Sequence, residues 1–209
     1  MTNSAIPAYD NVSGNYYDKY HTKNPVARWL MDGFFRSFDE LVAKSGAERA
    51  FEVGCGEGHL SLRMIEAGLS VSGIDLEQDA IEQARTNASL AGIYARFEVE
   101  DLYGLNAEER AAPLVVCCEV LEHVPDPDQA LAKLVTLADP WLLVSVPNEP
   151  LWRALNMARG KYLADFGNTP GHIQHWSSQG IETLVRRHAE IVEVRQPLPW
   201  TMILARTDG

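Results

Sequence analysis

The segment EVLEHV places two carboxylates and an imidazole, Glu119, Glu122 and His123, directly after an apolar run. Two more imidazoles, His172 and His175, lie downstream in GHIQHW. Imidazoles accept and release protons near neutral pH, and carboxylates and imidazoles together suit divalent cations. These two groups are therefore candidates for proton transfer or metal binding, with His123, His172 and His175 as candidate catalytic residues.

A glycine-rich turn is the second feature with chemical meaning. Gly54, Gly56 and Gly58 follow a predicted strand in FEVGCGEGHL and precede a predicted helix. Glycines at such a turn let the chain bend tightly and let a ligand approach the backbone. The next predicted strand ends at Asp75, where a carboxylate can accept hydrogen bonds from both hydroxyls of a ribose. Asp75 alone could cap the following helix, but together with the glycine turn it predicts a nucleoside site.

The spacing of the glycines separates two kinds of nucleoside ligand. Dinucleotide-binding proteins use GxGxxG and present a helix N-terminus to a pyrophosphate. This chain has GxGxG, with Glu52 and Glu57 beside the turn. Carboxylates repel a pyrophosphate and suit a ligand that carries an ammonium and a sulfonium. A nicotinamide-dependent oxidoreductase is therefore the less favoured interpretation.

The elements that must position these residues follow from the hydrophobic pattern. Asn24 and Pro25 predict the cap and first position of a helix. Apolar runs then alternate with helical patterns, which is typical of a parallel sheet. The predicted strands are RAFEV, SVSGI, ARFEV, PLVVCC, WLLVSV, EIVEVRQ and TMILAR. Only PLPW separates the last two, so they predict an antiparallel hairpin. We expect a doubly wound α/β fold with seven strands and helices on both faces.

We expect one domain over residues 1–209, with two segments added to its sheet. Residues 1–24 form a predicted N-terminal arm that contains Tyr16 and Tyr17, and residues 148–176 form a predicted insertion on the substrate side that contains Trp152. Long insertions in compact domains are usually functional. Tyr16, Tyr17 and Trp152 are therefore candidate substrate contacts, with plain packing against the core as the alternative.

The composition limits the class of partner. The formal net charge is −11, and no cluster of Lys and Arg dominates, so we expect a small-molecule substrate and no nucleic acid. The apolar stretches are too short to cross a bilayer and the N-terminus lacks a leader pattern, which favours a cytoplasmic protein without membrane contact. Cys55, Cys117 and Cys118 lack zinc-type spacing and are predicted to be small buried residues. The oligomeric state is not predicted.

Five segments carry a resemblance to a known family. EVGCGEG, GIDLEQDAIEQAR, FEVEDL, CCEVLEHVPDP and LLVSVPN, in this order and spacing, resemble class I S-adenosylmethionine-dependent methyltransferases over residues 45–150. The resemblance implies a Rossmann-like sheet of order 3-2-1-4-5-7-6, with S-adenosylmethionine lying over the carboxyl ends of strands 1 and 4.

The resemblance also assigns roles to residues. Glu52, Gly54, Cys55 and Gly56 would surround the methionine part of the cofactor, and Gly58 completes the turn. Asp75 would bind the ribose, Leu76 one face of the adenine, Asp101 and Leu102 the adenine edge, and Glu119 would lie near the sulfonium.

The set ExxEH with a downstream histidine resembles the metal constellation of ubiquinone-pathway O-methyltransferases and of small-RNA 2′-hydroxyl methyltransferases. It makes Glu119, Glu122 and His123 candidate metal ligands. EVLEH also occurs in metal-free members, where Glu122 and His123 stabilise the turn after the strand, and a metal-free site is expected here. We expect methyl transfer to a small molecule, at oxygen slightly before nitrogen or carbon. An RNA or protein methyltransferase and a non-catalytic S-adenosylmethionine-binding protein are the alternatives.

Overall fold

The computed structural model describes residues 24–158, 160, 165–169 and 171–207. Tyr16 and Tyr17 of the predicted arm lie outside the described residues. Within the described part of the chain, no helix is long and apolar enough to span a membrane.

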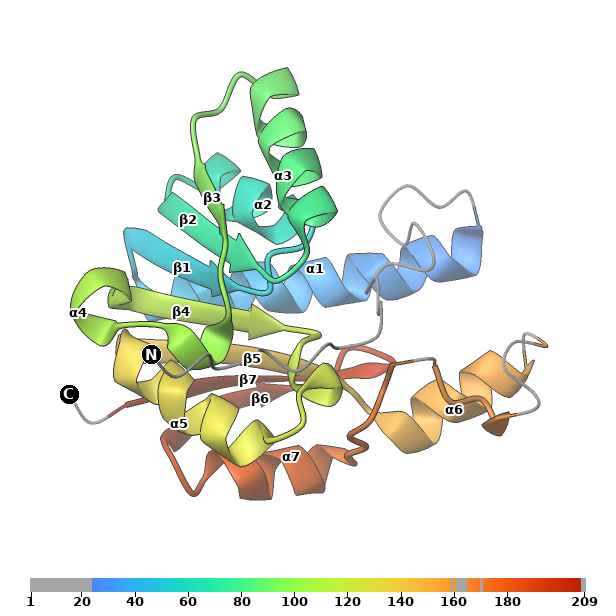
Figure 1. Ribbon diagram of the computed structural model, residues 1–209. Helices are drawn as coiled ribbons and strands as arrows, with labels where there is room; N and C mark the ends of the chain where they lie inside the picture. The colour runs from blue at the N-terminus through green and yellow to red at the C-terminus, as the bar shows by residue number, and fades with distance from the viewer. Residues whose placement is uncertain (1–23, 159, 161–164, 170, 208–209) are drawn as a thin grey trace, which may run out of the picture.

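The strands form one seven-stranded sheet with the order β3-β2-β1-β4-β5-β7-β6 (Figure 1). Strands β1 to β5 run parallel, and β7 runs antiparallel to both of its neighbours. Their bounds are β1 Arg49–Val53, β2 Ser70–Asp75, β3 Arg96–Val99, β4 Ala112–Cys118, β5 Ala138–Pro147, β6 Glu190–Arg195 and β7 Trp200–Arg206. The predicted fold class, strand order and final antiparallel hairpin are confirmed.

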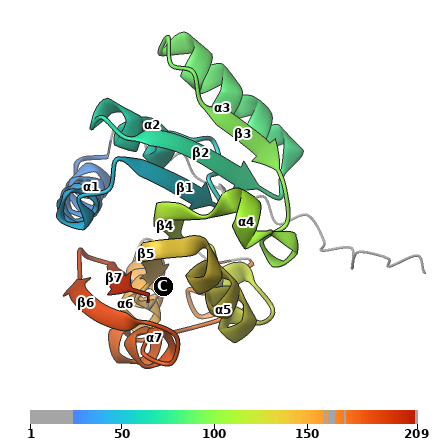
Figure 2. The ribbon, with the colours of Figure 1, turned by 90° about the vertical axis from the view of Figure 1, so that its left-hand side faces the viewer.

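Helices cover both faces of the sheet (Figure 2). Helices α1 and α2 pack on one face and α5 and α7 on the other, while α3 lies along β2 and β3. The helices are α1 Pro25–Ser45, α2 His59–Glu66, α3 Gln78–Leu90, α4 Ala107–Arg110, α5 Pro127–Leu137, α6 Glu149–Ala158 and α7 Ser178–Val185, with short 3₁₀ turns η1 Leu102–Gly104 and η2 Leu121–His123.

The start of α1 shows how the sequence sets an element. The Asn24 side chain accepts hydrogen bonds from the backbone N–H groups of Val26 and Ala27, at 2.9 and 3.3 Å. Pro25 occupies the first helical position, where its missing N–H costs nothing. The helix ends at Gly46, which adopts a left-handed φ of 63°. The predicted start at Asn24 and Pro25 is confirmed.

The central strand β4 is buried on both sides, as the middle of a doubly wound sheet requires. Leu114, Val116 and Cys118 pack in the core under α1 and α2, whereas Val115 and Cys117 pack in the core under α5 and α7. Cys55 is also buried, and the described cysteines are all free thiols. Burial raises the pKa of Cys117 above its ordinary value, so these thiols are small core residues.

The segment that follows β5 leaves the sheet and returns to it. Helix α6 extends beyond the carboxyl edge of the sheet (Figure 1). The two ends of the segment meet at an isolated parallel bridge between Asn148 and Trp176. The Glu149 N–H donates to the Trp176 carbonyl at 3.0 Å. The segment is therefore closed at its base, on the edge where the parallel strands end.

Candidate functional site

The glycine turn follows β1 at the carboxyl edge. The N–H groups of Gly54 and Cys55 both donate to the Ile74 carbonyl at 2.8 Å, which ties the turn to the end of β2. Gly54 and Gly56 have φ of 74° and 52°, values that side chains rarely adopt. A Cβ at Gly56 would meet nothing within 4 Å. The backbone at Gly56 therefore faces open space, as close approach of a ligand requires.

Asp75 is held at the tip of β2 by two backbone donors. Its Oδ2 accepts from the Gly56 N–H at 2.8 Å and its Oδ1 from the Glu77 N–H at 3.0 Å. Each carboxylate oxygen has a second lone pair for another donor. The carboxylate is thus oriented before any ligand arrives, and it is partly exposed.

Glu52, the penultimate residue of β1, is buried beneath the turn. Its carboxyl group accepts a hydrogen bond from the Ser61 hydroxyl of α2. Burial raises the pKa of Glu52 from 4.5 to about 8; the Ser61 hydrogen bond opposes this shift and the nearby charge of Asp75 adds to it. A cation near this group would favour its ionised form.

The other residues assigned to the adenine and the turn differ in what they expose. Leu76 is 49% exposed beside Asp75, where an apolar face could cover a base. The Leu102 side chain packs in the core and is not open to a ligand. Asp101 caps η1 by accepting from the Tyr103 N–H at 3.0 Å. A Cβ at Gly58 would lie 3.2 Å from Ala84 and Phe97, so this glycine allows close packing of α2 on α3.

Glu119 follows β4 and has an unusual backbone for its residue type, with φ of 60°. Its Oε1 accepts from the Ser145 hydroxyl at 2.9 Å, and its Oε2 accepts from the Trp200 indole N–H at 2.7 Å. A non-glycine residue with positive φ persists only where its surroundings hold it. Two side-chain donors from β5 and β7 therefore fix Glu119 between the ends of the central strands.

Glu122, His123 and His172 come together at the end of β4. One donor atom from each lies within 4.8 Å of the others. Glu122 and His172 are buried and His123 is partly exposed. The Glu122 carbonyl accepts from the Ile173 and Gln174 N–H groups at 2.9 and 3.0 Å, which ties the returning segment to η2.

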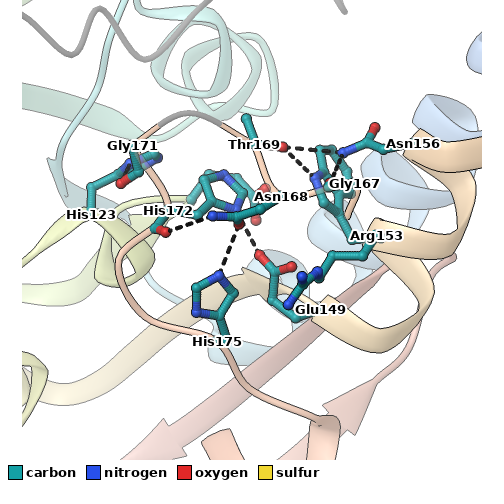
Figure 3. A network of polar contacts seen from close by, with 12 residues as sticks. His123, Glu149, Arg153, Asn156, Gly167, Asn168, Thr169, Gly171, His172 and His175 are labelled. Carbon is teal, nitrogen blue, oxygen red and sulfur yellow. Dashed lines mark hydrogen bonds and ion pairs between the residues drawn. The ribbon is translucent and has the colours of Figure 1, made fainter. Parts of the chain in front are cut away.

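The ring nitrogens of the two histidines have defined partners (Figure 3). His123 Nδ1 lies 2.9 Å from the Gly171 carbonyl oxygen. A carbonyl only accepts, so Nδ1 of His123 carries the proton of the neutral ring and Nε2 holds a lone pair. His172 Nδ1 lies 2.7 Å from Oε1 of Glu149. The rings of His123 and His172 meet edge to face, with centroids 5.0 Å apart.

The remaining predicted residues lie around this group. Trp152 stacks on His172, with ring centroids 6.2 Å apart and planes inclined by 27°, and its indole N–H donates to the Thr169 hydroxyl at 2.8 Å. His175 is exposed, and its Nε2 lies 2.8 Å from the Asn168 amide oxygen. The structure therefore brings His123 and His172 together, with Trp152 as a wall, and keeps His175 outside their group.

The donor set fits a divalent cation, because imidazoles and a carboxylate are suitable ligands. Ring N–H groups that donate to a carbonyl or a carboxylate are also common behind metal-bound histidines. Among the described residues, this set is Glu122, His123 and His172. Glu119, the third candidate ligand from the sequence pattern, accepts hydrogen bonds from Ser145 and Trp200. A bound ion would favour deprotonation of an acceptor hydroxyl.

Sequence reasoning missed Glu149 and Trp200. Glu149 reads as an ordinary acidic residue in the first turn of a helix, and Trp200 as part of a short loop between strands. Their partners, His172 and Glu119, are distant in the sequence, so no local pattern marks either contact. The one local signal for Glu149 is its position two residues after Pro147, the last residue of β5.

Comparison with known proteins identifies the domain. Residues 50–140 match a family described as a methyltransferase domain. A ubiquinone biosynthesis O-methyltransferase of Bordetella avium is 34% identical over 132 residues, which cover 61% of this chain and 52% of the relative. A relative of the same description from Ralstonia nicotianae is 38% identical over 102 residues, which cover 48% and 43% of the two chains. The chain spans about half the length of the curated relatives it matches.

Solved structures agree on the fold. A magnesium protoporphyrin IX methyltransferase from Synechocystis, crystallised with S-adenosylhomocysteine, superposes with a TM-score of 0.69 at 21% identity, over 90% of this chain and 89% of its own. An N-methyltransferase from Bradyrhizobium japonicum gives 0.67 at 16% identity, over 86% and 97% of the two chains. The sheet order agrees with the fold of these structures, and residues 50–140 are similar to a methyltransferase domain.

Proposed function

We propose that this protein transfers the methyl group of S-adenosylmethionine to a hydroxyl oxygen of a small molecule. The observation that carries the proposal is the group Glu122, His123 and His172, which lies past the end of β4 on the same edge as the glycine turn. The proposal thus joins a nucleoside site at β1 and β2 to a proton-accepting group at β4.

The cofactor half of the proposal rests on charge and exposure. Asp75 presents an oriented carboxylate to the ribose hydroxyls, and the exposed face of Leu76 covers the adenine. The ammonium of the methionine part lies near Glu52, whose ionisation a cation favours. With the nucleoside at β2, the methionine part extends across the turn toward β4.

The methyl transfer itself requires that the acceptor hydroxyl is aligned with the methyl group and that one side chain accepts its proton. The hydroxyl oxygen of the acceptor attacks the methyl carbon as the carbon–sulfur bond breaks in line, which leaves a neutral thioether. The hydroxyl proton passes to Nε2 of His172, which we assign as the base. Trp152 and His123 form neighbouring walls that keep the ring in place and exclude water.

Two further observations support an oxygen acceptor of small size. Two of the matched relatives are described as ubiquinone biosynthesis O-methyltransferases. A proton acceptor aids a hydroxyl, whose proton must leave, more than it aids an amine that attacks in its neutral form. The net charge of −11 disfavours an RNA substrate, which would require several neutralised phosphates.

Calorimetric titration with S-adenosylmethionine, S-adenosylhomocysteine and NAD tests the cofactor. We expect micromolar binding of the first two, equivalent to about −8 kcal/mol, and none of NAD. A panel of phenols, catechols and aliphatic alcohols, with RNA and amines as comparison acceptors, then tests the substrate class by mass spectrometry. Binding of NAD alone, or methylation confined to RNA or amines, would overturn the proposal.

Exhaustive chelation separates a base from a metal ion. We expect turnover to survive EDTA, because His172 accepts the proton without a bound ion. His172→Gln should then lower kcat by about 100-fold or more, the range of general base catalysis, while the affinity for S-adenosylhomocysteine stays unchanged. Loss of turnover on chelation that Mn²⁺, Mg²⁺ or Zn²⁺ restores would assign the group to an ion instead.

A further inference from the structure

We propose that Glu149 is a positioning residue, which holds His172 in the tautomer that carries its proton on Nδ1 and its lone pair on Nε2. This inference rests on the proposed function, in which His172 accepts the proton of the acceptor hydroxyl. Glu149 acts through His172 and touches neither ligand.

The contact itself defines the tautomer. Oε1 of Glu149 lies 2.7 Å from Nδ1 of His172, and the two side chains are only 4% and 6% exposed. An ionised carboxylate accepts hydrogen bonds and donates none, so the proton of this bond belongs to Nδ1. In the neutral ring the other nitrogen, Nε2, then holds the lone pair.

In the described part of the chain, His172 is the side-chain partner of the Glu149 carboxyl group. Its Oε2 is buried there without a hydrogen-bond partner. A buried carboxylate is costly unless it is compensated, and His172 supplies its side-chain contact. The residue lies in the first turn of α6, where the helix end favours a negative charge. Within the described residues, the Glu149 carboxyl group therefore has one side-chain hydrogen-bond partner, the His172 imidazole.

The plane of the His172 ring is fixed separately from its tautomer. Trp152 stacks on the ring, and the Thr169 hydroxyl holds the Trp152 indole N–H at 2.8 Å. The His172 N–H donates to the Thr169 carbonyl at 3.1 Å, which anchors the backbone of the same residue. Because packing sets the plane of the ring, the hydrogen bond to Glu149 sets which ring nitrogen carries the proton.

The tautomer decides what the group can do. The Nδ1 atoms of both rings are committed, His123 to the Gly171 carbonyl and His172 to Glu149. Only the second of these acceptors is charged, and a negative charge stabilises the positive charge that develops when a ring takes up a proton. His172 is thus the ring prepared to accept a proton at Nε2, and Glu149 is the reason.

Nitrogen-15 NMR of the imidazole rings tests the tautomer without an acceptor or turnover. The chain has six histidines, and the signals of His172 are identified by their loss in His172→Gln. We expect Nδ1 of His172 to be protonated in the wild type and in Glu149→Gln, whose amide oxygen still accepts the hydrogen bond. Glu149→Ala should show a mixture of tautomers. A wild-type spectrum with the proton on Nε2 would overturn the inference.

Kinetics test the consequence. Glu149→Gln should lower kcat by about 10- to 100-fold, the usual effect of losing such a supporting partner, with KM for the acceptor and the affinity for S-adenosylhomocysteine within about twofold of the wild type. Glu182→Gln removes a half-buried carboxylate that pairs with Arg186 next to α7 and is the matched control. Circular dichroism confirms that each variant is folded.

The two proposals fail in different ways. If S-adenosylmethionine does not bind and no acceptor is methylated, the proposed function fails, while the NMR spectrum still reports the tautomer. If methyl transfer is found and Glu149→Gln and Glu149→Ala both turn over like the wild type, the role of Glu149 fails alone.

Discussion

Asp75 and Glu52 are two carboxyl groups on neighbouring strands, and their surroundings differ. Backbone N–H groups on either side stabilise the Asp75 carboxylate in a partly exposed position. Glu52 lies beneath the same turn, where burial favours its protonated form. One residue is therefore prepared to accept hydrogen bonds, and the other to change its protonation state when a cation arrives.

Replacing Asp75 should weaken cofactor binding. Asp75→Ala removes the proposed acceptor of the ribose hydroxyls, and the loss of a hydrogen bond to a charged group costs about 1–3 kcal/mol. Calorimetry with S-adenosylhomocysteine measures the change. Glu77→Ala is the control, because Glu77 carries the same charge two residues away and makes no side-chain cap contact with α3. Equal affinities of wild type and Asp75→Ala would remove Asp75 from the site.

The raised pKa of Glu52 predicts a pH-dependent stability. Between pH 4.5 and about 8, the folded state keeps a proton at Glu52 that the unfolded state has released. The free energy of unfolding therefore falls as the pH rises through this window. At about 1.4 kcal/mol per pKa unit, the wild type should lose at most about 4 kcal/mol more than Glu52→Gln between about pH 5 and about pH 8.

Urea denaturation at both pH values measures this difference in the absence of ligand. Glu66→Gln, an exposed change at the end of α2, should follow the wild type at both values. If wild type and Glu52→Gln lose the same stability with rising pH, Glu52 is ionised throughout and the cause assigned to burial is wrong.

The roles that could be predicted from the sequence belong to residues whose function follows from local position. Asp75 is predicted from its position at the end of a strand. Gly54 and Gly56 are predicted from a turn between a strand and a helix. Glu149 and Trp200 could not be predicted, since their meaning depends on His172 and Glu119, which come close only in the folded chain. The burial of Leu102 also depends on how α5 packs above it.

The glycine turn depends on its neighbour across the sheet as well as on its own backbone. A Cβ at Gly54 would lie 2.2 Å from Cγ2 of Val120, which follows β4. The turn and the segment from Glu119 to His123 are therefore in direct contact. Any side chain at Gly54 must displace Val120 and hence disturb the residues between Glu119 and His123.

Gly54→Ala should lower the free energy of unfolding by about 2–4 kcal/mol, the sum of a left-handed backbone and an overpacked contact. Gly46→Ala is the matched control, because Gly46 has a similar φ of 63° and nothing within 4 Å of its Cβ. Urea denaturation should show a smaller loss there, about 1–2 kcal/mol. Adding Val120→Ala to Gly54→Ala should recover part of the difference; no recovery would show that Val120 is not the obstacle.

Periodicity sufficed for the regular elements. The pattern from Pro127 to Leu137 predicts α5 with its observed bounds, and Asp126 caps it by accepting from the Gln129 N–H. The chain after β5 has no such regular pattern. Its arrangement depends on contacts such as those of Asn156 with the Gly167 carbonyl and the Thr169 hydroxyl, which no periodicity encodes.

The proposed ligand contacts residues from both halves of the sheet, so binding should stabilise the whole molecule. Asp75 lies on β2 and Glu52 on β1, while Glu119 follows β4. At a concentration of S-adenosylhomocysteine of about 100 times Kd, the gain is about 2.7 kcal/mol. For a chain of this length this corresponds to a rise in Tm of about 5–10 °C.

Scanning calorimetry measures this rise, with NAD as the control ligand. One cooperative transition that moves as a unit is the expected form, because the two cores share a single sheet. Two transitions, of which only one moves with ligand, would contradict a single cooperative domain.

The parallel bridge between Asn148 and Trp176 determines how the segment between these residues is joined to the sheet. The segment between these residues leaves and re-enters the fold at one point, where Glu149 N–H meets the Trp176 carbonyl. The register of β5 and β7 is therefore set outside this segment. A graft of the segment between relatives that keeps Asn148, Trp176 and the pair Glu149 and His172 should carry acceptor preference with it.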